Sequence, residues 1–233
     1  MSLLFELSCP TVAIAGDERR FPVRRIFCVG RNYAAHAREM GMDPGREPPF
    51  FFMKPADAVV ENGADVPYPP ATENLHHEIE LVVAIGGLAQ DLAVDEASAV
   101  IFGYAVGNDL TRRDLQLAMR EKGRPWEVGK AFEHSAPITA IHPAARIGHP
   151  ASGRIWLSVN GALRQEADLG DLIWSVPEIL MHLSRLFTLK PGDLVFTGTP
   201  AGVGPLQPGD VVEGGVDGVD VLRHRIVAAG EQA

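Results

Sequence analysis

The segment HHEIELVVAIG, residues 76–86, is an apolar run that carries two acidic side chains and ends at paired glycines. Its length and its β-branched residues predict a β-strand. Because side chains alternate across a strand, Glu78 and Glu80 are expected on one face, opposite an apolar face. Neighbouring carboxylates repel each other and lose hydration when buried, and a divalent cation between them would offset both costs. The alternative is an edge strand whose acidic face lies in water.

Asp109 ends the next expected strand, FGYAVGND, and stands directly before an expected helix. An aspartate at that position can cap the helix. The end of a strand beside glycines is also a common place for a ligand. Together with Glu78 and Glu80, Asp109 would form an all-oxygen site, which favours Mg²⁺ or Mn²⁺ over Ca²⁺ and Zn²⁺. A mixed site remains open, because His76 shares the face of the two glutamates.

Short strands and short helices are expected around these two segments. Helices are predicted over residues 32–41, 93–100, 111–123 and 175–187. Further strands are predicted within 1–24, 26–30, 50–55, 58–60, 153–167, 189–199 and 206–216. Strands outnumber helices and their order is not a regular βαβ alternation, so the sequence predicts a β-rich α+β fold rather than a doubly wound sheet.

Local signals support several of these boundaries. Asn32 would cap the first helix and Gly41 would end it. The pair Asn160-Gly161 lies between two extended segments and is typical of a type I′ hairpin turn. Ser175 and Glu178 have the spacing of a capping box at the start of the clearest helix.

The composition is that of a globular protein. Of 233 residues, 46% are hydrophobic and 22% are charged. No linker or composition shift divides the chain, so we expect one catalytic domain over 1–233, with an N-terminal strand or arm over 1–24 and a core over about 25–218. The net charge of −9 disfavours nucleic acid and anionic membrane as partners. A small anionic substrate would need local positive charge, which a divalent metal supplies.

Three features predict a cytoplasmic protein. No run of 18 apolar residues is long enough to span a membrane. The first residues lack the basic start of a signal peptide. Cys9 and Cys28 show no metal-type spacing, and both thiols are expected to be at least partly buried.

Two helices carry polar pairs that point to catalysis. His36 and Glu39 are three residues apart, so they share a helix face, where the carboxylate would fix the imidazole tautomer and raise its basicity. The alternative is a surface pair. Arg113 and Gln116 have the same spacing and would project near whatever Asp109 binds.

Two further segments leave alternatives open. Lys130 lies in the apolar stretch VGKAF, where it either extends its amine to water or is a desolvated acid, base or anion-stabilising group. The stretch TGTPAGVG, residues 197–204, can point backbone N–H groups at a carboxylate, or it is a tight loop that requires positive φ.

The order of these motifs resembles the fumarylacetoacetate hydrolase family. The matching segments are VGRNYAAHAREMG, PPFFFMKPADAVV, NLHHEIELVVAIG, GYAVGNDLTRRDLQ, PWEVGKAF, LSVNGALRQ and GDLVFTGTPAGVGPL. They cover most of residues 26–215. The chain looks most like the single-domain acylpyruvate hydrolases, and within them like the fumarylpyruvate hydrolases of gentisate breakdown, chiefly through REPPFFFMKPADAVV.

The resemblance implies a mixed β-roll with short peripheral helices, assembled as a homodimer. It implies that Glu78, Glu80 and Asp109 bind one Mg²⁺ or Mn²⁺ per subunit. Larger relatives supply a fourth carboxylate ligand, for which this sequence shows no counterpart, so water is expected to complete the coordination.

The resemblance also implies roles around the substrate. His36 and Glu39 would activate water, and Lys130 would assist by neutralising charge or relaying a proton. Residues expected to contact the small anionic 2-oxo acid are Arg113, Gln116 and Thr199. The pocket for the distal end of the acyl group is expected near residues 42–50.

The expected reaction is hydrolysis of the carbon–carbon bond of an acylpyruvate, with fumarylpyruvate giving fumarate and pyruvate. The alternative within the family is a decarboxylase or tautomerase of oxaloacetate, or another 2-oxo-acid lyase. The hydratases and decarboxylases of catechol meta-cleavage are a more distant alternative. A non-catalytic binding protein that retains the fold is the alternative from a different class.

Overall fold

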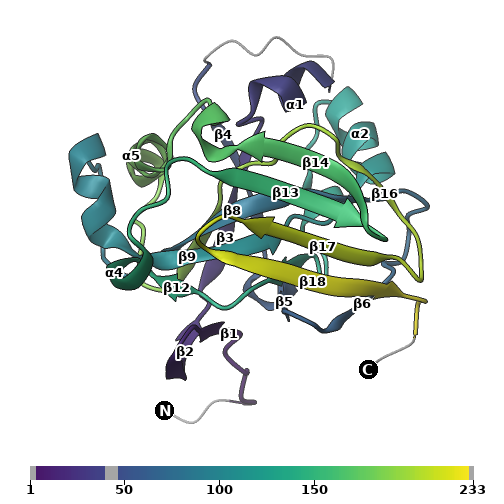
Figure 1. Cartoon of the computed structure of the whole chain (residues 1–233), viewed down its shortest axis with the longest axis horizontal. Coiled ribbons are helices and arrows are strands. Elements are labelled where there is room, and N and C mark those ends of the chain that lie inside the picture. The colour runs from purple at the N-terminus through teal and green to yellow at the C-terminus, as the bar shows by residue number, and fades with distance from the viewer. Residues whose placement is uncertain (1–3, 40–46, 231–233) are drawn as a thin grey trace.

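The computed structural model describes residues 4–39 and 47–230, and its largest element is an eight-stranded mixed sheet (Figure 1). In spatial order its strands are β4 (Phe50–Lys54), β3 (Arg25–Gly30), β15 (Asp193–Phe196), β8 (Ile79–Ile85), β9 (Ile101–Asn108), β11 (Ala136–Ile138) and β5 (Val59–Glu61), with β12 (His142–Pro143) beside β9. The pairs β15–β3 and β11–β5 are parallel.

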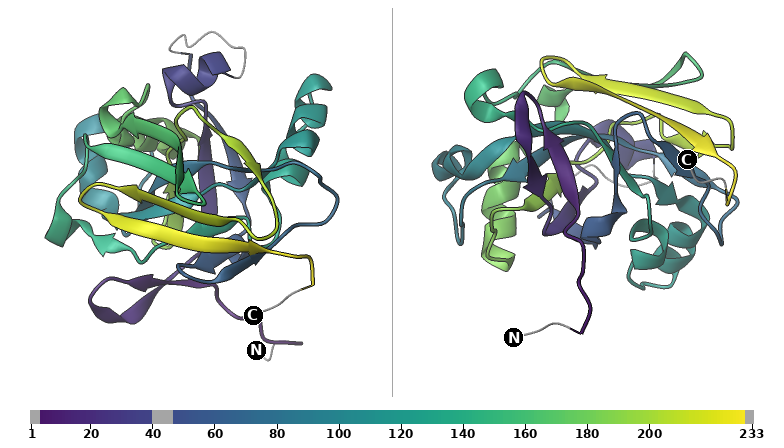
Figure 2. Two further views of the ribbon diagram at one scale, coloured as in Figure 1. Left: turned by 45° about the vertical axis from the view of Figure 1, so that its right-hand side comes forward. Right: turned by 90° about the horizontal axis from the view of Figure 1, so that it is seen from below.

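A five-stranded sheet packs over one face of the larger sheet, as Figures 1 and 2 show. Its strands are β14 (Ala162–Asp168), β13 (Arg154–Val159), β17 (Val211–Val216), β18 (Asp220–Val227) and β6 (Asp65–Pro67). The main core lies between the two sheets and contains Leu81 and Val83 of β8 with Leu157 of β13.

The opposite face of β8 is also buried. Val82 and Ala84 belong to a second core with Phe21, which lies on the hairpin of β1 (Thr11–Ile14) and β2 (Asp17–Pro22). Strand β8 is therefore covered on both faces, which explains its nearly continuous apolar sequence.

Smaller elements complete the fold. A three-stranded sheet contains β10 (Thr111–Arg112), β7 (Leu75–His77) and β16 (Gly204–Leu206). The α-helices are α1 (Ala34–Glu39), α2 (Arg113–Glu121), α3 (Glu127–Lys130), α4 (Ala144–Ile147) and α5 (Val176–Leu186). In the part of the chain that the structure describes, 3₁₀ helices cover Ala56–Ala58, Val94–Val100 and Leu169–Asp171. The expected β-rich α+β fold with short peripheral helices is confirmed. Across the described ranges, every helix is too short or too polar to span a bilayer.

Two local predictions are confirmed in detail. Asn160 and Gly161 have φ of 51° and 77°, the positive values that a type I′ turn requires. At the start of α5, Glu178 Oε2 accepts hydrogen bonds from the backbone N–H (2.9 Å) and Oγ (2.7 Å) of Ser175.

Three other local predictions differ from the structure in part or in full. The strand predicted over 76–86 is confirmed over most of its length, but it divides at Glu78, because β7 pairs with β10 and β16 while β8 pairs with β9 and β15. The short helix predicted over 93–100 is present as a 3₁₀ helix over Val94–Val100. Asn32 does not cap α1, since its amide donates to the carbonyls of Trp174 and Thr197.

Further predictions differ from the structure or concern residues that it does not describe. Cys9 is exposed, although Cys28 is buried as expected. The core continues past residue 218, because Leu222 and Ile226 of β18 point into it. The expected helix end at Gly41 and residues 42–46 of the expected distal pocket lie outside the described residues.

Candidate active site

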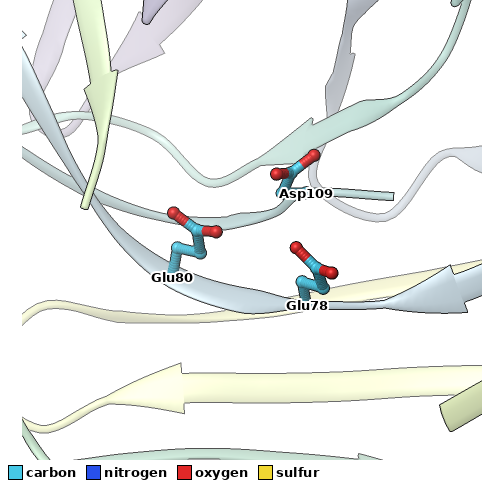
Figure 3. A group of neighbouring side chains, drawn as sticks. All are labelled: Glu78, Glu80 and Asp109. Atoms are coloured by element: carbon cyan, nitrogen blue, oxygen red, sulfur yellow. The ribbon is translucent and has the colours of Figure 1, made fainter. Parts of the chain in front are cut away.

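Antiparallel pairing of β8 with β9 brings three carboxylates together. Ile79 faces Asn108 in this pairing, and the N–H of Asp109 donates to the carbonyl of Glu78 at 2.8 Å. Figure 3 shows Glu78 and Glu80 projecting on the same side of one segment, with Asp109 on the neighbouring segment. Each of the three offers a ligand oxygen, and these oxygens lie within 4.8 Å of one another. We call Glu78, Glu80 and Asp109 the carboxylate triad.

The triad is buried, and this burial distinguishes a metal site from an edge strand whose acidic face lies in water. Glu78, Glu80 and Asp109 are 5%, 2% and 0% exposed. An edge strand with its acidic face in water is therefore wrong. The helix-cap interpretation of Asp109 is also wrong, because α2 begins only at Arg113. His76 is not part of the triad, since its Nε2 lies 2.9 Å from Asn74 Oδ1.

Three buried cations surround the triad. Lys130 Nζ donates to Glu78 Oε2 at 2.7 Å and to Asp109 Oδ2 at 2.6 Å. The guanidinium of Arg113 donates to Glu78 Oε1. Lys54 Nζ forms an ion pair with Asp109 Oδ1 at 2.8 Å. The interpretation of Lys130 as a residue that extends to water is thus wrong, because its amine ends among carboxylates.

The two glutamates respond differently to this environment. Burial raises the pKa of Glu78, but the charges of Lys130 and Arg113 outweigh burial and hold that pKa well below its usual range. The pKa of Glu80 is raised well above its usual value by burial and by the charges of Asp109 and Glu78. The Gly198 N–H, which donates to Glu80 Oε2 at 2.6 Å, offsets part of this rise. A divalent cation would relieve the same repulsion.

Helix α1 presents the predicted imidazole–carboxylate pair. His36 Nδ1 lies 3.1 Å from Glu39 Oε2, and His36 is buried. The N–H of Gly202 donates to both carboxylate oxygens of Glu39, at 3.0 and 3.2 Å. The backbone N–H groups of residues 197–204 therefore do point at carboxylates, as predicted. The acceptors are the side chains of Glu39 and Glu80 in the same chain. Its Gly198 and Gly202 also have positive φ, as the alternative interpretation required.

All nine predicted site residues except Glu39 and Asp109 line one pocket. The residues that line it are Val29, Gly30, Arg31, His36, Phe52, Glu78, Glu80, Arg113, Gln116, Arg120, Trp126, Lys130 and Thr199. Glu39 and Asp109 reach it through His36 and Lys130, which they contact directly. The pocket therefore joins a carboxylate triad, a histidine beside a carboxylate, and several cations.

Sequence reasoning missed three residues that support this site. Lys54 neutralises Asp109, and its only local signal is a lone lysine after three phenylalanines and a methionine. Gln165 of β14 donates from Nε2 to Thr199 Oγ1 at 2.8 Å, while its Oε1 accepts from the Ile79 N–H at 3.2 Å. His224 of β18 lies 2.9 Å from Asn108 Nδ2, and burial lowers the pKa of His224 to about 3, which leaves it a neutral acceptor.

Comparisons with known proteins agree with this geometry. A family model described as fumarylacetoacetate (FAA) hydrolase C-terminal matches residues 25–227. A crystal structure of fumarylpyruvate hydrolase from Pseudomonas aeruginosa, in complex with Mn²⁺ and pyruvate, has a TM-score of 0.95 and 55% identity, and the match covers 97% of this chain and 100% of that one.

Two curated relatives are named for a different activity. The mitochondrial oxaloacetate tautomerase FAHD1 of Mus musculus is 43% identical over 205 residues, 87% of this chain and 91% of the relative. Oxaloacetate tautomerase YcgM of Escherichia coli (strain K12) is 42% identical over 199 residues, 85% of this chain and 90% of the relative. The matched length, the shared fold and the carboxylate triad together show that the chain belongs to the fumarylacetoacetate hydrolase family.

Proposed function

We propose that the protein is a metal-dependent hydrolase that cleaves fumarylpyruvate to fumarate and pyruvate, a reaction of gentisate breakdown. One observation carries the proposal: a single pocket is lined both by carboxylates of the triad and by His36, which is paired with Glu39. The first group suits the stabilisation of an enolate, and the second suits the activation of water.

The triad fits a hard divalent cation. Its donors are all carboxylate oxygens, which Mg²⁺ and Mn²⁺ prefer, and they converge within 4.8 Å. When bound, such a cation would supply Lewis-acid stabilisation of the negative charge that develops on the pyruvate part of the substrate. Gly198 helps to orient one of the ligands, since its N–H fixes Glu80 Oε2.

The chain's own residues divide the remaining work. His36 removes a proton from water, and Glu39 holds the imidazole orientation and stabilises the imidazolium that forms. The resulting hydroxide attacks the carbonyl of the acyl group. The carbon–carbon bond then breaks and its electron pair leaves with pyruvate as an enolate. Lys130, whose amine lies beside the triad, supplies positive charge and a proton for that enolate.

Charge balance supports an anionic substrate. In the described structure, the negative charges of the triad are matched by Lys54, Lys130 and Arg113. A divalent cation adds positive charge to a buried site, and unpaired buried charge is costly. A substrate that carries carboxylate would offset that excess, with Arg113, Gln116 and Thr199 placed in the same pocket to bind it.

Oxaloacetate tautomerisation is a second candidate, supported by the names of the relatives that share 42–43% identity. Tautomerisation also passes through an enol or enolate, so the triad would serve it equally well. It breaks no carbon–carbon bond. Release of pyruvate therefore distinguishes the two reactions.

A substrate panel tests the proposal. The protein, loaded with Mn²⁺, is offered fumarylpyruvate, maleylpyruvate, acetylpyruvate and oxaloacetate. We expect loss of the ultraviolet band of the enolised diketone in fumarylpyruvate, with stoichiometric release of pyruvate. Activity confined to oxaloacetate would reject the hydrolase proposal and favour the tautomerase or a decarboxylase.

Two variants test the assigned roles. His36→Ala is expected to keep its affinity for Mn²⁺, measured by calorimetry, and to lose at least about tenfold in kcat, because general-base catalysis contributes roughly 10²–10⁴. Glu80→Gln is expected to lose both Mn²⁺ binding and turnover. Glu73→Gln is a matched control, since that carboxylate is exposed. A His36→Ala variant that hydrolyses at the wild-type rate contradicts the role of His36.

A further inference from the structure

Two arginines that no part of the proposed mechanism uses also line the pocket. Arg31 and Arg120 line it together with the aromatic side chains of Phe52 and Trp126. Within residues 4–39 and 47–230, neither arginine forms an ion pair, and the buried Nε of Arg31 has no hydrogen-bond partner. An anion would complete the contacts of both groups.

Arg120 marks the far end of the pocket from the triad. Arg113, Gln116 and Arg120 are spaced i, i+3 and i+7, so they follow one face of α2. Arg113 at the start of this face donates to Glu78 of the triad. Seven residues of helix rise about 10 Å along the axis, so Arg120 lies about that far along α2 from the metal end.

Arg31 is held at the pocket by strained backbone. It connects β3 to α1 with φ of 63°, a left-handed conformation that is uncommon for a long side chain. Its guanidinium lies 5.1 Å from the centre of the Phe50 ring. Burial and the positive charge of Arg120 lower the pKa of Arg31, with Glu47 acting in the opposite sense. The two guanidinium groups therefore repel each other.

Part of the pocket wall is aromatic. Phe52 and Trp126 line it, with ring centres 5.9 Å apart. Phe50 meets Trp126 edge to face at 5.0 Å and so supports this wall from the side of Arg31. Such a surface suits a planar, conjugated acyl chain.

We propose that Arg31 and Arg120 form a subsite for a second carboxylate, which selects acylpyruvates whose acyl group itself ends in a carboxylate. This rests on the proposed hydrolase function. The two carboxyl carbons of extended fumarylpyruvate are about 7 Å apart, the reach of two extended residues. One hydrogen bond of about 2.9 Å at the distal carboxylate extends this reach to about 10 Å, which matches the rise along α2 from Arg113 to Arg120.

Substrate selectivity tests the subsite. The quantity measured is the ratio of kcat/KM for fumarylpyruvate to kcat/KM for acetylpyruvate, which lacks the distal carboxylate. Arg120→Gln is expected to lower this ratio about tenfold to a hundredfold, mainly through KM for fumarylpyruvate, because a charge-assisted hydrogen bond is lost. Arg31→Asn is expected to do the same, and asparagine tolerates the left-handed backbone.

Arg124→Gln is the matched control. It removes the same charge near the end of α2 from an exposed position that does not line the pocket, and it should leave the ratio unchanged. If Arg120→Gln and Arg31→Asn both keep the wild-type ratio of kcat/KM values, the proposal of a subsite is rejected. That result would not contradict the proposed hydrolase function.

Binding of fumarate separates failure of the subsite from failure of the function. Fumarate titrated by calorimetry is expected to bind the wild type and Arg124→Gln equally, and to bind Arg120→Gln at least about tenfold more weakly. If the protein cleaves no acylpyruvate but shows this binding pattern, the proposed hydrolase function is rejected and the proposed carboxylate subsite is supported. Equal binding of fumarate by all variants rejects the subsite whatever the activity.

Discussion

At the scale of single residues, Lys54 decides the charge balance of the site. Its side chain is fully buried, its Nζ lies 2.8 Å from Asp109 Oδ1, and it donates to the carbonyl of Leu110 at 3.0 Å. Asp109 has Lys130 as its other cation, which it shares with Glu78. Removal of Lys54 would therefore leave buried negative charge without full compensation, a situation that typically costs several kcal/mol.

Lys54→Met tests this balance. Without added metal, the free energy of unfolding is expected to fall by about 3–5 kcal/mol, the usual loss when one partner of a buried ion pair is removed. Saturating Mn²⁺ should recover much of this loss, because a cation bound to the folded state stabilises it and supplies positive charge to the triad. Urea unfolding with and without Mn²⁺ measures both effects.

The control for this variant is Lys190→Met, which removes a lysine from an exposed position. Its effect is expected to stay within about 0.5 kcal/mol. If Lys54→Met unfolds at the wild-type urea concentration in the absence of metal, the assigned charge balance is wrong.

The sequence could predict the residues whose relation is local. Glu78 and Glu80 share a face because they are two apart, and His36 and Glu39 meet because they are three apart on a helix. Lys54 could not be derived this way, because β4 reaches Asp109 only through the fold of the large sheet. Arg120 also has helical spacing to Gln116, but nothing local shows that this face of α2 lines a pocket.

At the scale of elements, α5 shows how a local motif fixes a helix end. Ser175 donates to Glu178 from both its N–H and its Oγ, and Ile179 and Leu183 on the same helix are buried. Ser175→Ala is expected to destabilise the protein by about 1 kcal/mol. For a chain of this size that lowers Tm by about 2–4 °C, which calorimetric melting would detect.

Ser175→Asn is the matched rescue, because asparagine is also a strong N-cap residue. Both variants should keep the wild-type kcat/KM, since Ser175 does not line the pocket of the candidate site. A loss of activity in Ser175→Ala at unchanged Tm would show that α5 acts on the site rather than on stability.

The elements that the sequence predicted well are those whose signals are local, such as the hairpin turn at Asn160-Gly161. The division of the 76–86 strand at Glu78 could not be predicted, because it follows from pairing with β10 and β16. The position of that division matters for function. It places Glu78 at the junction of two sheets, where Arg113 and Lys130 approach it.

At the scale of the whole molecule, the sequence indicated a β-rich domain but not the order of its strands. Parallel neighbours such as β15 and β3 join residues 193–196 to 25–28, and β18 pairs in parallel with β6. Such pairings depend on packing over long chain separations, which single-sequence patterns do not report. The core between the two sheets buries Ile79 and Leu81, so Glu78 and Glu80 project from the opposite face of the strand (Figure 3), while β18 contributes His224 beside Asn108.

We propose that two copies of this molecule associate, as the family resemblance implies. Figure 2 shows the N-terminal segment projecting away from the two sheets. On it Leu4, Phe5 and Leu7 are 95%, 66% and 82% exposed. Clustered apolar side chains in water favour contact with another protein surface, and a second copy is the partner that the resemblance supplies. Sedimentation equilibrium at micromolar concentration is expected to give about twice the chain mass of 25.1 kDa.

The double variant Leu4→Asp, Leu7→Asp tests whether this segment makes the contact. It should weaken dimerisation at least about tenfold, because two charges would be desolvated in the interface. Leu88→Asp changes an equally apolar, 69% exposed residue elsewhere on the surface and serves as the control. A wild-type mass of one chain rejects the dimer. A dimer that the double variant leaves as tight as the wild type rejects only the N-terminal contact, and other exposed apolar residues such as Val221 then become the next to change.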